Sequence, residues 1–467
     1  MRRTKIICTL GPATFSAEKI GELVTAGANI FRINMSHATH ERVSEIVPLI
    51  RQLADAHGKF TGILMDTQGP AIRTGDLQRE IPLQPGDIFE FTVRGATSRE
   101  PKSVTVNYDG LVDDVHVGAT VLVDNGLIQM QALEKGRDRL RCKVLTQGSL
   151  GSRRHINLPG VRVNLPALTE KDLRDVALGA RLGVDMVALS FCREAKDVDL
   201  LREVLKSHGS EARIVAKIED QLAVAGVNAI IEKADAIMVA RGDLGIECAM
   251  EDLPIIQRKI VKRCMHIGRP VIVATQMLES MIQNPMPTRA EVTDVANAVF
   301  EQADAIMLSG ETATGRYPVE CVRVLDRIAR RIERSGGAGY ASDAILEDDR
   351  QKTIRSAVVL ANSLPSAKLL VFTRSGYMAD CLSNLRPLFA PIFAFAPSVE
   401  ICRRLALNWG IFPHLLPLDA DPNRTIRAAE EILLAHDLAK ASDHLVVISD
   451  LLAGEQRFVS VQLRVVK

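Results

Sequence analysis

Apolar runs of strand length recur eight times along the chain, and each is followed by a segment with helical spacing. Eight strands that alternate with helices predict an α/β fold whose parallel sheet closes into a (β/α)8 barrel, the TIM barrel. An internal repeat supports this, because residues 234–238 (ADAIM) reappear as residues 303–307. The expected strands are TKIICTL (4–10), ANIFRINM (28–35), TGILMDTQ (61–68), MVALSFC (186–192), RIVAKIE (213–219), AIMVAR (236–241), PVIVATQM (270–277) and AIMLS (305–309).

The interval after the third run is far longer than the others and opens at Gly69-Pro70. Within it, alternating apolar runs are separated by turn sequences of the Asn-Gly and Asp-Gly kind, which are typical of β-hairpins. The sequence therefore predicts a small inserted β-barrel over 70–165. We expect it to act as a lid on the large barrel, which residues 1–69 and 166–334 form.

A glycine-rich stretch at 335–339 follows the last run of the barrel. Beyond it, the runs LLVFTRSG, PIFAFA and HLVVIS alternate with helical segments. This pattern predicts a separate C-terminal α/β domain over 340–467.

Charge and cysteine content exclude several classes of protein. The 58 basic and 57 acidic residues leave a net charge of +1, so no field of one sign exists to bind nucleic acid or an anionic membrane. The eight cysteines form no C-x-x-C pair and no zinc-like spacing with histidine, as expected in a reducing compartment. No uncharged apolar stretch approaches the roughly 20 residues of a spanning helix. We therefore expect a soluble, cytoplasmic protein.

Polar side chains interrupt the apolar runs near their carboxyl ends, where barrels of this kind place their active sites. Arg32, Asn34 and Ser36 fall at alternate positions, so they share one face of their strand. Lys217 and Glu219 repeat the pattern three strands further on in the predicted site. Charged groups of both signs should therefore meet at one mouth of the barrel.

Two further runs end in the carboxylates Asp66 and Asp243. Carboxylates without a His or Cys cluster suit a hard cation such as Mg²⁺ or Mn²⁺ and do not favour zinc. Burying so many charges is costly unless they are paired or hold a metal, so we interpret them as an active site. A charge network that only closes the barrel is the alternative interpretation.

The segment 242–245 (GDLG) follows a strand and precedes a helical segment. Its backbone N–H groups could hold a carboxylate or phosphate at a helix N-terminus. An ordinary tight turn between strand and helix explains the glycines equally well.

Seven motifs stand in the order that is typical of the pyruvate kinases, and with the insert and the tail they make nearly the whole chain similar to this family. They are FRINMSH, DTQGPAIRTG, VAKIED, ARGDLGIE, ATQMLESM, PTRAEVTDVANAV and SGETATGRYP. The resemblance implies a phosphotransferase that moves the phosphoryl group of phosphoenolpyruvate to ADP, giving pyruvate and ATP in the last step of glycolysis. It also implies a homotetramer whose C-terminal domain serves regulation and oligomerisation.

The resemblance assigns the charged residues their roles. Glu219 and Asp243 would ligate Mg²⁺, and Lys217 would stabilise the metal-bound enolate, a task that suits a fixed point charge in a dry site. Arg32 would bind the phosphate of the substrate.

The uncharged groups of the site receive roles in the same way. The N–H groups of Gly242 and Asp243 would bind the substrate carboxylate, and Thr275 would help to deliver the proton to the enolate. Ser190 is expected nearby without a settled role. On the nucleotide side, the resemblance implies Arg73, His37 and a basic residue at 152–154, best matched by Arg154.

A monovalent-cation site, normally filled by K⁺, is implied by four matching positions. They are Asn34, Ser36, Asp66 and Thr67. The pattern that follows departs from the family, because Gln68 and Ala71 replace the usual Lys and Glu. Members that depend on K⁺ carry Glu at the second position and independent members carry Lys, so the dependence on K⁺ stays open.

In the tail, Thr373, Ser375 and Gly376 resemble the family's phosphate-binding loop for sugar-phosphate effectors. A strand-to-helix turn with a capping serine is the equal alternative. The segment 449–454 lacks the aromatic and basic residues of members that respond to fructose 1,6-bisphosphate, so the sequence does not identify an effector.

Two other functions remain open at this point. A barrel lyase or aldolase could use Mg²⁺ and the same Lys, Glu and Asp to stabilise an enolate of pyruvate, although Arg73, His37 and the lid would then have no purpose. An inactive paralogue that binds effectors or acts as a scaffold would explain Gln68, Ala71 and Asn125, but not the intact charged residues.

Overall fold

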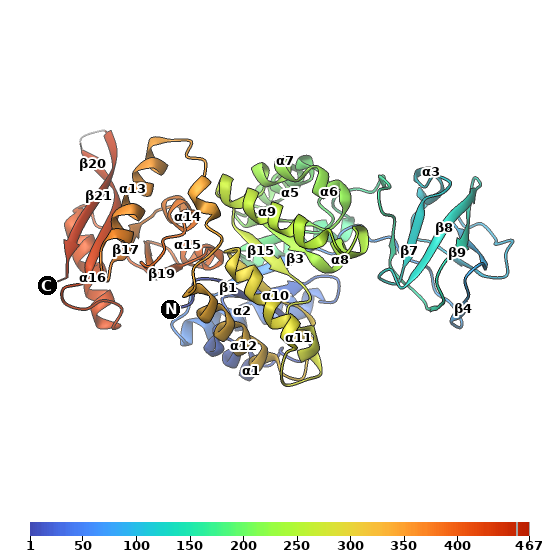
Figure 1. Cartoon of the computed structure of the whole chain (residues 1–467), viewed down its shortest axis with the longest axis horizontal. Coiled ribbons are helices and arrows are strands. Elements are labelled where there is room, and N and C mark those ends of the chain that lie inside the picture. The colour runs from blue at the N-terminus through green and yellow to red at the C-terminus, as the bar shows by residue number, and fades with distance from the viewer. Residues whose placement is uncertain (454–455, 467) are drawn as a thin grey trace.

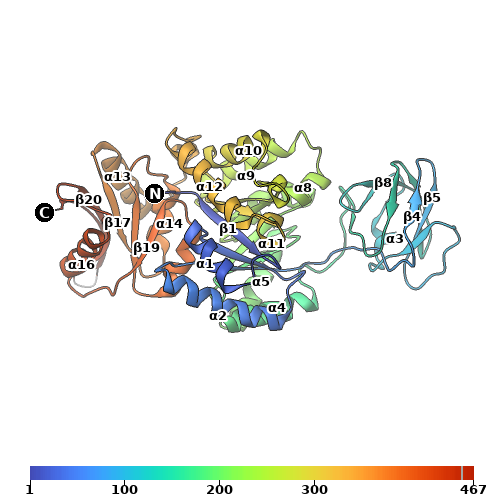
Figure 2. The ribbon, with the colours of Figure 1, turned by 90° about the horizontal axis from the view of Figure 1, so that it is seen from below.

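The computed structural model describes residues 1–453 and 456–466. Three parts follow one another along the longest axis of the molecule (Figure 1). The inserted β domain lies at one end, the barrel in the middle and the C-terminal domain at the other end. Figure 2 shows that extended segments join the insert to the barrel.

Eight parallel strands form the closed barrel that the sequence predicts. The strands are β1 Lys5–Leu10, β2 Ile30–Asn34, β3 Gly62–Asp66, β12 Met186–Leu189, β13 Arg213–Ile218, β14 Ala236–Ala240, β15 Val271–Ala274 and β16 Ala305–Leu308. Around the barrel their order is β1-β16-β15-β14-β13-β12-β3-β2. The long insert therefore leaves the ring intact, because β3 and β12 pair directly, with Leu64 opposite Met186.

The alternation of side chains along β2 separates two cores. Ile30 belongs to the small cluster inside the barrel, whereas Phe31 and Ile33 belong to the large cluster between the strands and the helices. Arg32 and Asn34 thus point to the inside, as their spacing predicts.

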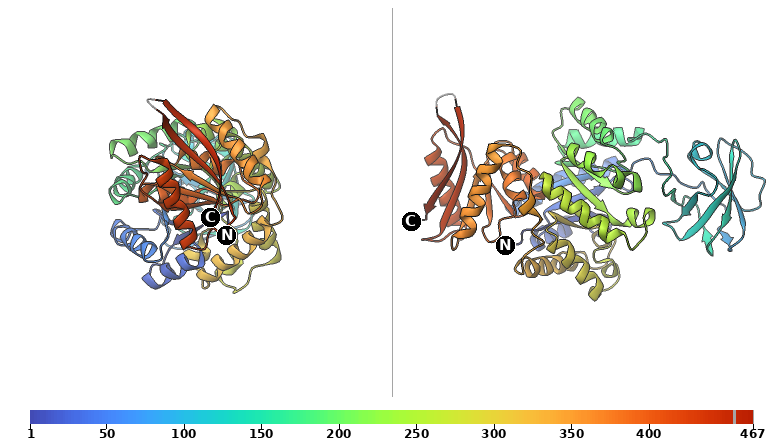
Figure 3. Two further views of the ribbon diagram at one scale, coloured as in Figure 1. Left: turned by 90° about the vertical axis from the view of Figure 1, so that its left-hand side faces the viewer. Right: turned by 45° about the horizontal axis from the view of Figure 1, so that its top comes forward.

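Helices surround the barrel, as the end-on view shows (Figure 3). They are α1 Ala17–Ala26, α2 His40–Ala56, α4 Glu170–Leu182, α5 Ala195–Ser207, α6 Gln221–Ala225, α7 Val227–Lys233, α8 Arg241–Glu247, α9 Leu253–Ile267, α10 Arg289–Phe300, α11 Gly310–Ala313 and α12 Pro318–Glu333, with the 3₁₀ turns η1 Glu279–Ile282 and η2 Tyr340–Asp343. Several of these helices begin with a capping box. At the start of α10, the side chains of Thr288 and Glu291 each accept from the other's backbone N–H group. No helix in the described part of the chain is long and apolar enough to cross a bilayer.

The insert contains a six-stranded sheet in the order β11-β7-β8-β9-β5-β6 and a two-stranded sheet of β10 and β4. Its elements are β4 Ile81–Leu83, β5 Ile88–Thr92, β6 Ser103–Thr105, α3 Leu111–Asp114, β7 Thr120–Val123, β8 Ile128–Lys135, β9 Arg139–Val144, β10 Gly148–Leu150 and β11 Ile156–Asn157. These strands enclose one hydrophobic core that includes Phe89, Phe91 and Met130. The strands are divided between two sheets, so their ladder does not form a single closed ring like that of the main barrel.

The C-terminal domain has a five-stranded sheet in the order β19-β18-β17-β20-β21. Its elements are α13 Asp349–Ser363, β17 Lys368–Phe372, α14 Tyr377–Asn384, β18 Ile392–Ala396, α15 Val399–Arg404, η3 Leu405–Leu407, β19 Ile411–Leu415, α16 Pro422–Ala435, β20 His444–Ala453 and β21 Gln456–Val465. The sequence predicted β17, β18 and β20 but not the two edge strands. Of the segment 449–454, Gly454 lies outside the described residues.

A segment of the C-terminal domain closes the amino end of the barrel. Ala406 and Leu407 are buried in the same cluster as the inward-facing Ile7 and Ile30 of the barrel strands. The next residues bind the barrel rim, since the N–H of Trp409 donates to Asp304 Oδ1 at 3.0 Å. We call residues 405–409 the floor segment.

Candidate active site

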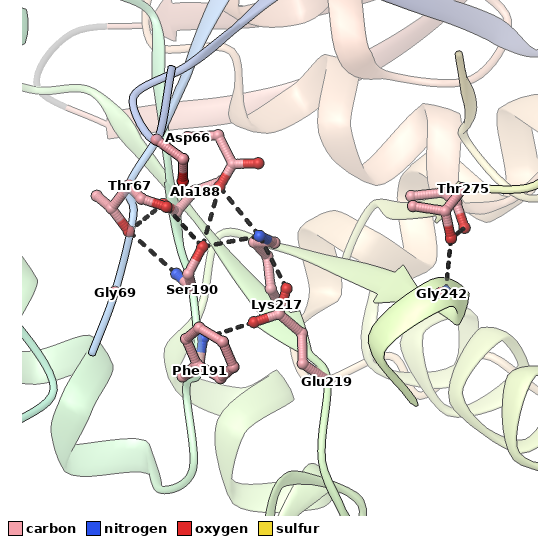
Figure 4. A network of polar contacts seen from close by, with 12 residues as sticks. Asp66, Thr67, Gly69, Ala188, Ser190, Phe191, Lys217, Glu219, Gly242 and Thr275 are labelled. Atoms are coloured by element: carbon pink, nitrogen blue, oxygen red, sulfur yellow. Dashed lines mark hydrogen bonds and ion pairs between the residues drawn. The ribbon is translucent and has the colours of Figure 1, made fainter. Parts of the chain in front are cut away.

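Lys217 lies in a buried ion-pair network at the carboxyl end of the barrel strands (Figure 4). Its Nζ is 2.8 Å from Glu219 Oε1 and 3.2 Å from Asp66 Oδ1. It also donates to Ser190 Oγ at 2.7 Å. The ammonium group is therefore fixed by contacts from three neighbouring strands or their loops.

Asp66 joins this network to a second cation. Arg32 donates from Nε to Asp66 Oδ2 at 2.6 Å and from Nη1 to Thr9 Oγ1 at 3.0 Å. The Asp66 carboxylate is fully buried, and it lies between Arg32 and Lys217. Two positive charges thus stand side by side at the mouth of the barrel with their geometry set by one carboxylate.

The pKa values of the network follow from burial and charge. Burial would raise the pKa of Asp66, but Lys217 and Arg32 outweigh it and the pKa falls below its usual value. Burial would lower the pKa of Lys217, but Asp66 and Glu219 outweigh it and the pKa is raised. The Lys217 ammonium therefore stays charged at neutral pH.

Glu219 differs, because burial raises the pKa of its carboxyl and Lys217 offsets only part of the effect. Asp243, at the start of α8, adds to the rise. These two carboxylates line one cavity, and among the described residues no donor contacts that of Asp243. A cation bound between the two carboxylates would relieve their mutual repulsion.

The donor set fits a hard divalent cation. In residues 1–453 and 456–466, no group of three or more His, Cys, Asp and Glu side chains is arranged to hold a metal. The carboxylates that line the cavity from the barrel are Glu219 and Asp243. Mg²⁺ is commonly held in this way by one or two carboxylates together with water and substrate oxygens.

The turn after β15 carries Thr275, which Figure 4 shows next to Gly242 and apart from the Lys217 network. Thr275 and Gln276 have φ angles of 67° and 54°, which cost about 1–3 kcal/mol each in non-glycine residues. Thr275 Oγ1 accepts from the N–H of Gly242 at 2.7 Å and donates to the Ala274 carbonyl at 2.6 Å. The first turn of α8 and the strained turn are thus held together.

A cavity of about 400 Å³ connects the barrel with the insert. Its charged barrel residues are Arg32, Lys217, Glu219 and Asp243. From the insert side, Arg73, Arg153, Arg154 and Asp124 line the same cavity. Five cations and three carboxylates around one cavity can hold an anionic ligand together with a metal.

Comparison with known proteins agrees with this geometry. The family model "Pyruvate kinase, barrel domain" matches residues 1–322 and "Pyruvate kinase, alpha/beta domain" matches residues 351–461. The chain belongs to the pyruvate kinase family.

Individual pyruvate kinases match over nearly the whole chain. Pyruvate kinase of Geobacillus stearothermophilus is 40% identical over 465 residues, which cover 97% of this chain and 78% of that protein. The chloroplastic pyruvate kinase isozyme G of Nicotiana tabacum is 40% identical, covering 96% and 80%. The crystal structure of a pyruvate kinase from Cryptosporidium parvum superposes with a TM-score of 0.94 at 32% identity, covering 100% of this chain and 96% of the other.

The residues predicted for the nucleotide of a pyruvate kinase are not all brought together. Arg73 and Arg154 line the cavity, whereas His37 is exposed on the turn after β2, where its N–H donates to the Asn34 carbonyl at 3.1 Å. Arg153 also lines the cavity, but it forms two bonds to Asp76, at 2.7 and 2.9 Å, whereas Arg154 has one longer ion pair, from Nη1 to Asp124 at 3.4 Å. The choice of Arg154 stays a prediction that these contacts favour.

The predicted K⁺ residues of the family lie near one another at the rim. Asn34, Ser36 and Thr67 line the cavity, and Asp66 lies beneath it with both oxygens engaged by Arg32, Lys217 and Ser190. Ala71 and Gln68 also line the cavity. The position where many pyruvate kinases carry a charge thus presents a methyl group.

The loop that resembles the effector site of pyruvate kinases joins β17 to α14. Thr373 is buried, and its Oγ1 accepts from the N–H of Gly376 at 2.9 Å. Gly376 has a φ of 96°, which favours glycine, and it is itself the N-cap of α14. Ser375 is therefore not the capping residue, and an effector role for the loop stays a prediction.

Sequence reasoning missed two residues that organise this pyruvate kinase site. Asp172 Oδ1 accepts from the N–H groups of Gln68 and Gly69 at 3.0 and 3.1 Å, where the chain leaves the barrel for the insert. Its capping-box spacing after Thr169 could have indicated a helix start there. The other residue is Arg241, which contacts the turn of Thr275.

Proposed function

We propose that the chain transfers the phosphoryl group of phosphoenolpyruvate to ADP, giving pyruvate and ATP. The observation that carries this proposal is the shared cavity, in which Lys217 and Arg32 of the barrel face Arg73 and Arg154 of the insert. A lyase acting on pyruvate alone would have no use for the second pair. Two sets of cations on two domains suit a donor and an acceptor that both carry phosphate.

In this reaction Lys217 and Arg32 stabilise the negative charge on the phosphoryl group in the transition state. They also stabilise the enolate oxygen from which the phosphoryl group departs. Phosphoryl transfer depends on alignment and on neutralising charge. Because Asp66 fixes both cations in the ligand-free protein, little reorganisation is needed when charge develops.

Glu219 and Asp243 would hold Mg²⁺ or Mn²⁺, which when bound neutralises phosphate oxygens and polarises the substrate. The N–H group of Asp243 would orient the substrate carboxylate, because that of Gly242 donates to Thr275 Oγ1. Thr275 Oγ1, just after β15, would pass a proton toward the enolate carbon. Closure of the insert would exclude water and so prevent hydrolysis.

Asn34, Ser36, Asp66 and Thr67 supply oxygen atoms only, a donor set that suits K⁺. Ala71 leaves the neighbouring position uncharged. We infer a K⁺ site here, whose effect on rate is a matter for measurement.

The test is pyruvate release from phosphoenolpyruvate with Mg²⁺ and ADP, with and without K⁺. Lys217→Met serves as the blank, because a neutral side chain of similar length removes the charge. Lys206→Met, on the exposed face of α5, is the matched control. We expect turnover that requires ADP and Lys217 and is unchanged in the control.

Other outcomes separate the alternatives. Pyruvate release that is independent of ADP would support the lyase. No turnover under any condition, in a folded protein, would support an inactive paralogue. Equal rates in K⁺ and in Na⁺ or choline would show that the reaction does not need the K⁺ site.

We also propose a homotetramer in the cytoplasm. Large apolar side chains are exposed on two domains, and such side chains mark surfaces that a partner subunit could cover. On the barrel they include Met250 at 80% and Met286 at 74%, and on the C-terminal domain Val359 at 64% and Phe389 at 74%. Light scattering after size-exclusion chromatography would give the mass, and a monomer would contradict this proposal.

The division into residues 1–69 with 166–334, 70–165 and 340–467 is a further proposal. Separate hydrophobic cores in the barrel, the insert and the tail support it. Limited proteolysis should cut first near 335–339 and at the two connections of the insert.

A further inference from the structure

The turn that carries Thr275 needs support from outside itself. Thr275 and Gln276 both adopt the left-handed region, with φ of 67° and 54°. A β-branched residue rarely takes this conformation, so the turn would relax if its contacts were lost. Relaxation would move Oγ1 of Thr275, since χ1 and the backbone determine its position.

The support comes from the guanidinium group of Arg241, which is 6% exposed. Its Nη2 donates to the Thr275 carbonyl at 2.7 Å and to the Gln276 carbonyl at 3.2 Å, and its Nε is 3.3 Å from the former. One planar group thus satisfies the carbonyls of both strained residues.

The other side of the guanidinium binds α10. Nη1 of Arg241 donates to Asp294 Oδ1 at 2.7 Å. The ion pair fixes the plane of the guanidinium group, and the fixed plane determines which carbonyls it can reach.

The backbone next to Arg241 completes the arrangement. The N–H of Gly242 donates to Thr275 Oγ1 at 2.7 Å. Two consecutive residues of α8 therefore bind Thr275. Arg241 donates to the carbonyl of Thr275, and Gly242 donates to the hydroxyl of Thr275. A displacement of the turn would change the direction of the hydroxyl relative to the cavity.

We propose that Arg241, oriented by Asp294, is a positioning residue that sets the Thr275 hydroxyl for proton delivery. This inference rests on the function proposed above. The alternative is that Arg241 only ties the end of β14 to α10 and contributes to stability. The two differ in whether its effect passes through Thr275.

The test is a double-mutant cycle of Arg241→Lys and Thr275→Val. The readout is exchange of the pyruvate methyl protons for deuterium in D₂O with Mg²⁺ and ATP, followed by NMR. In this exchange a C–H bond of the methyl group breaks, its electron pair moves to form the enolate, and the proton passes to solvent. A deuteron from solvent then returns to carbon. Proton transfer at carbon is thereby observed without net phosphoryl transfer.

We expect each single variant to slow exchange about tenfold or more, with the KM for phosphoenolpyruvate in the forward reaction changed less than about threefold. The double variant should exchange at the rate of Thr275→Val, because Arg241 has nothing left to position. Losses that multiply would overturn the inference, and so would normal exchange in Arg241→Lys.

If Arg241→Lys does not fold, as judged by thermal unfolding, Asp294→Asn takes its place in the same cycle. It keeps the shape of the side chain and removes the charge that orients the guanidinium. We again expect the double variant to exchange at the rate of Thr275→Val. Losses of exchange rate that multiply would contradict the proposal. Failure of wild-type protein to release pyruvate in an ADP-dependent manner would instead refute the proposed function.

Discussion

The adjacent residues Arg153 and Arg154 of the insert make different contacts, which their positions in the sequence do not distinguish. Arg153 has a φ of 57° and pairs with Asp76 on the surface. Arg154 is directed to the cavity; its Nε is buried without a partner among the described residues, and its Nη1 is 3.4 Å from Asp124. An unsatisfied buried donor is costly, so Arg154 is the member of the pair that gains most from an anion.

Arg154→Ala should therefore raise the KM for ADP about tenfold, which corresponds to about 1.4 kcal/mol, with the KM for phosphoenolpyruvate nearly constant. Steady-state kinetics with each substrate varied in turn would measure this. Arg153→Ala is the matched control and should change neither constant more than about twofold. A larger effect on ADP from Arg153 would reverse the assignment.

At this scale, spacing along a single strand predicted the site well, because alternation alone puts Lys217 and Glu219 on one face. It could not reveal Arg241, whose acceptors are backbone carbonyls of a turn on another strand. It also placed His37 with the nucleotide residues, whereas the structure has it exposed outside the cavity.

Helix α8 links the proposed substrate site to the hinge of the insert. Its first turn contains Gly242 and Asp243, and Glu247 at its end accepts from Asn157 Nδ2 at 2.9 Å, on the strand by which the chain returns to the barrel. Glu247 is buried. Burial raises the pKa of its carboxyl to about 7; Asn157 opposes the rise, and Asp220 and Asp243 add to it.

This pKa has a consequence for stability. The folded-state value of about 7 lies above the unfolded value of 4.5, so between these pH values the folded protein keeps a proton that the unfolded chain loses. The contribution of Glu247 to stability is therefore greatest below pH 4.5 and falls as pH rises to 7.

Glu247→Gln should remove this loss of stability with rising pH, because glutamine does not titrate. At pH 8 the variant should be more stable than wild type by on the order of 2 kcal/mol, and at pH 4 the two should be alike. Urea unfolding at both pH values would measure the difference, with the exposed Glu251→Gln as control. A variant that is less stable at pH 8 would show that the ionised carboxylate is the favoured partner of Asn157.

The elements themselves were predictable where they are buried. All eight barrel strands were found, although the runs extended past several strand ends into loops, since apolar loop residues also line the core. The strand β19 was missed because Pro413 interrupts it, which only an edge strand tolerates. β21, the other edge strand, was also not predicted, and its residues alternate between polar and apolar.

For the whole molecule, the barrel depends on the C-terminal domain for part of its interior. Leu407 of the floor segment is fully buried against the inward-facing residues of the strands. Leu407→Ala should destabilise the protein by about 2–5 kcal/mol, seen as a lower midpoint of thermal unfolding that affects the barrel and the tail together. Leu415→Ala, in β19 and 43% exposed, is the control, and equal small effects of both variants would contradict the prediction.

Residues 405–409 thus belong to one domain by sequence and to another by contact. A chimera that joined the barrel of one relative to the tail of another would place a foreign side chain against Ile7 and Ile30. Such hybrids should fail unless these facing residues are exchanged as a set. We therefore expect substitutions in the floor segment to be accompanied by substitutions at the barrel residues that face it.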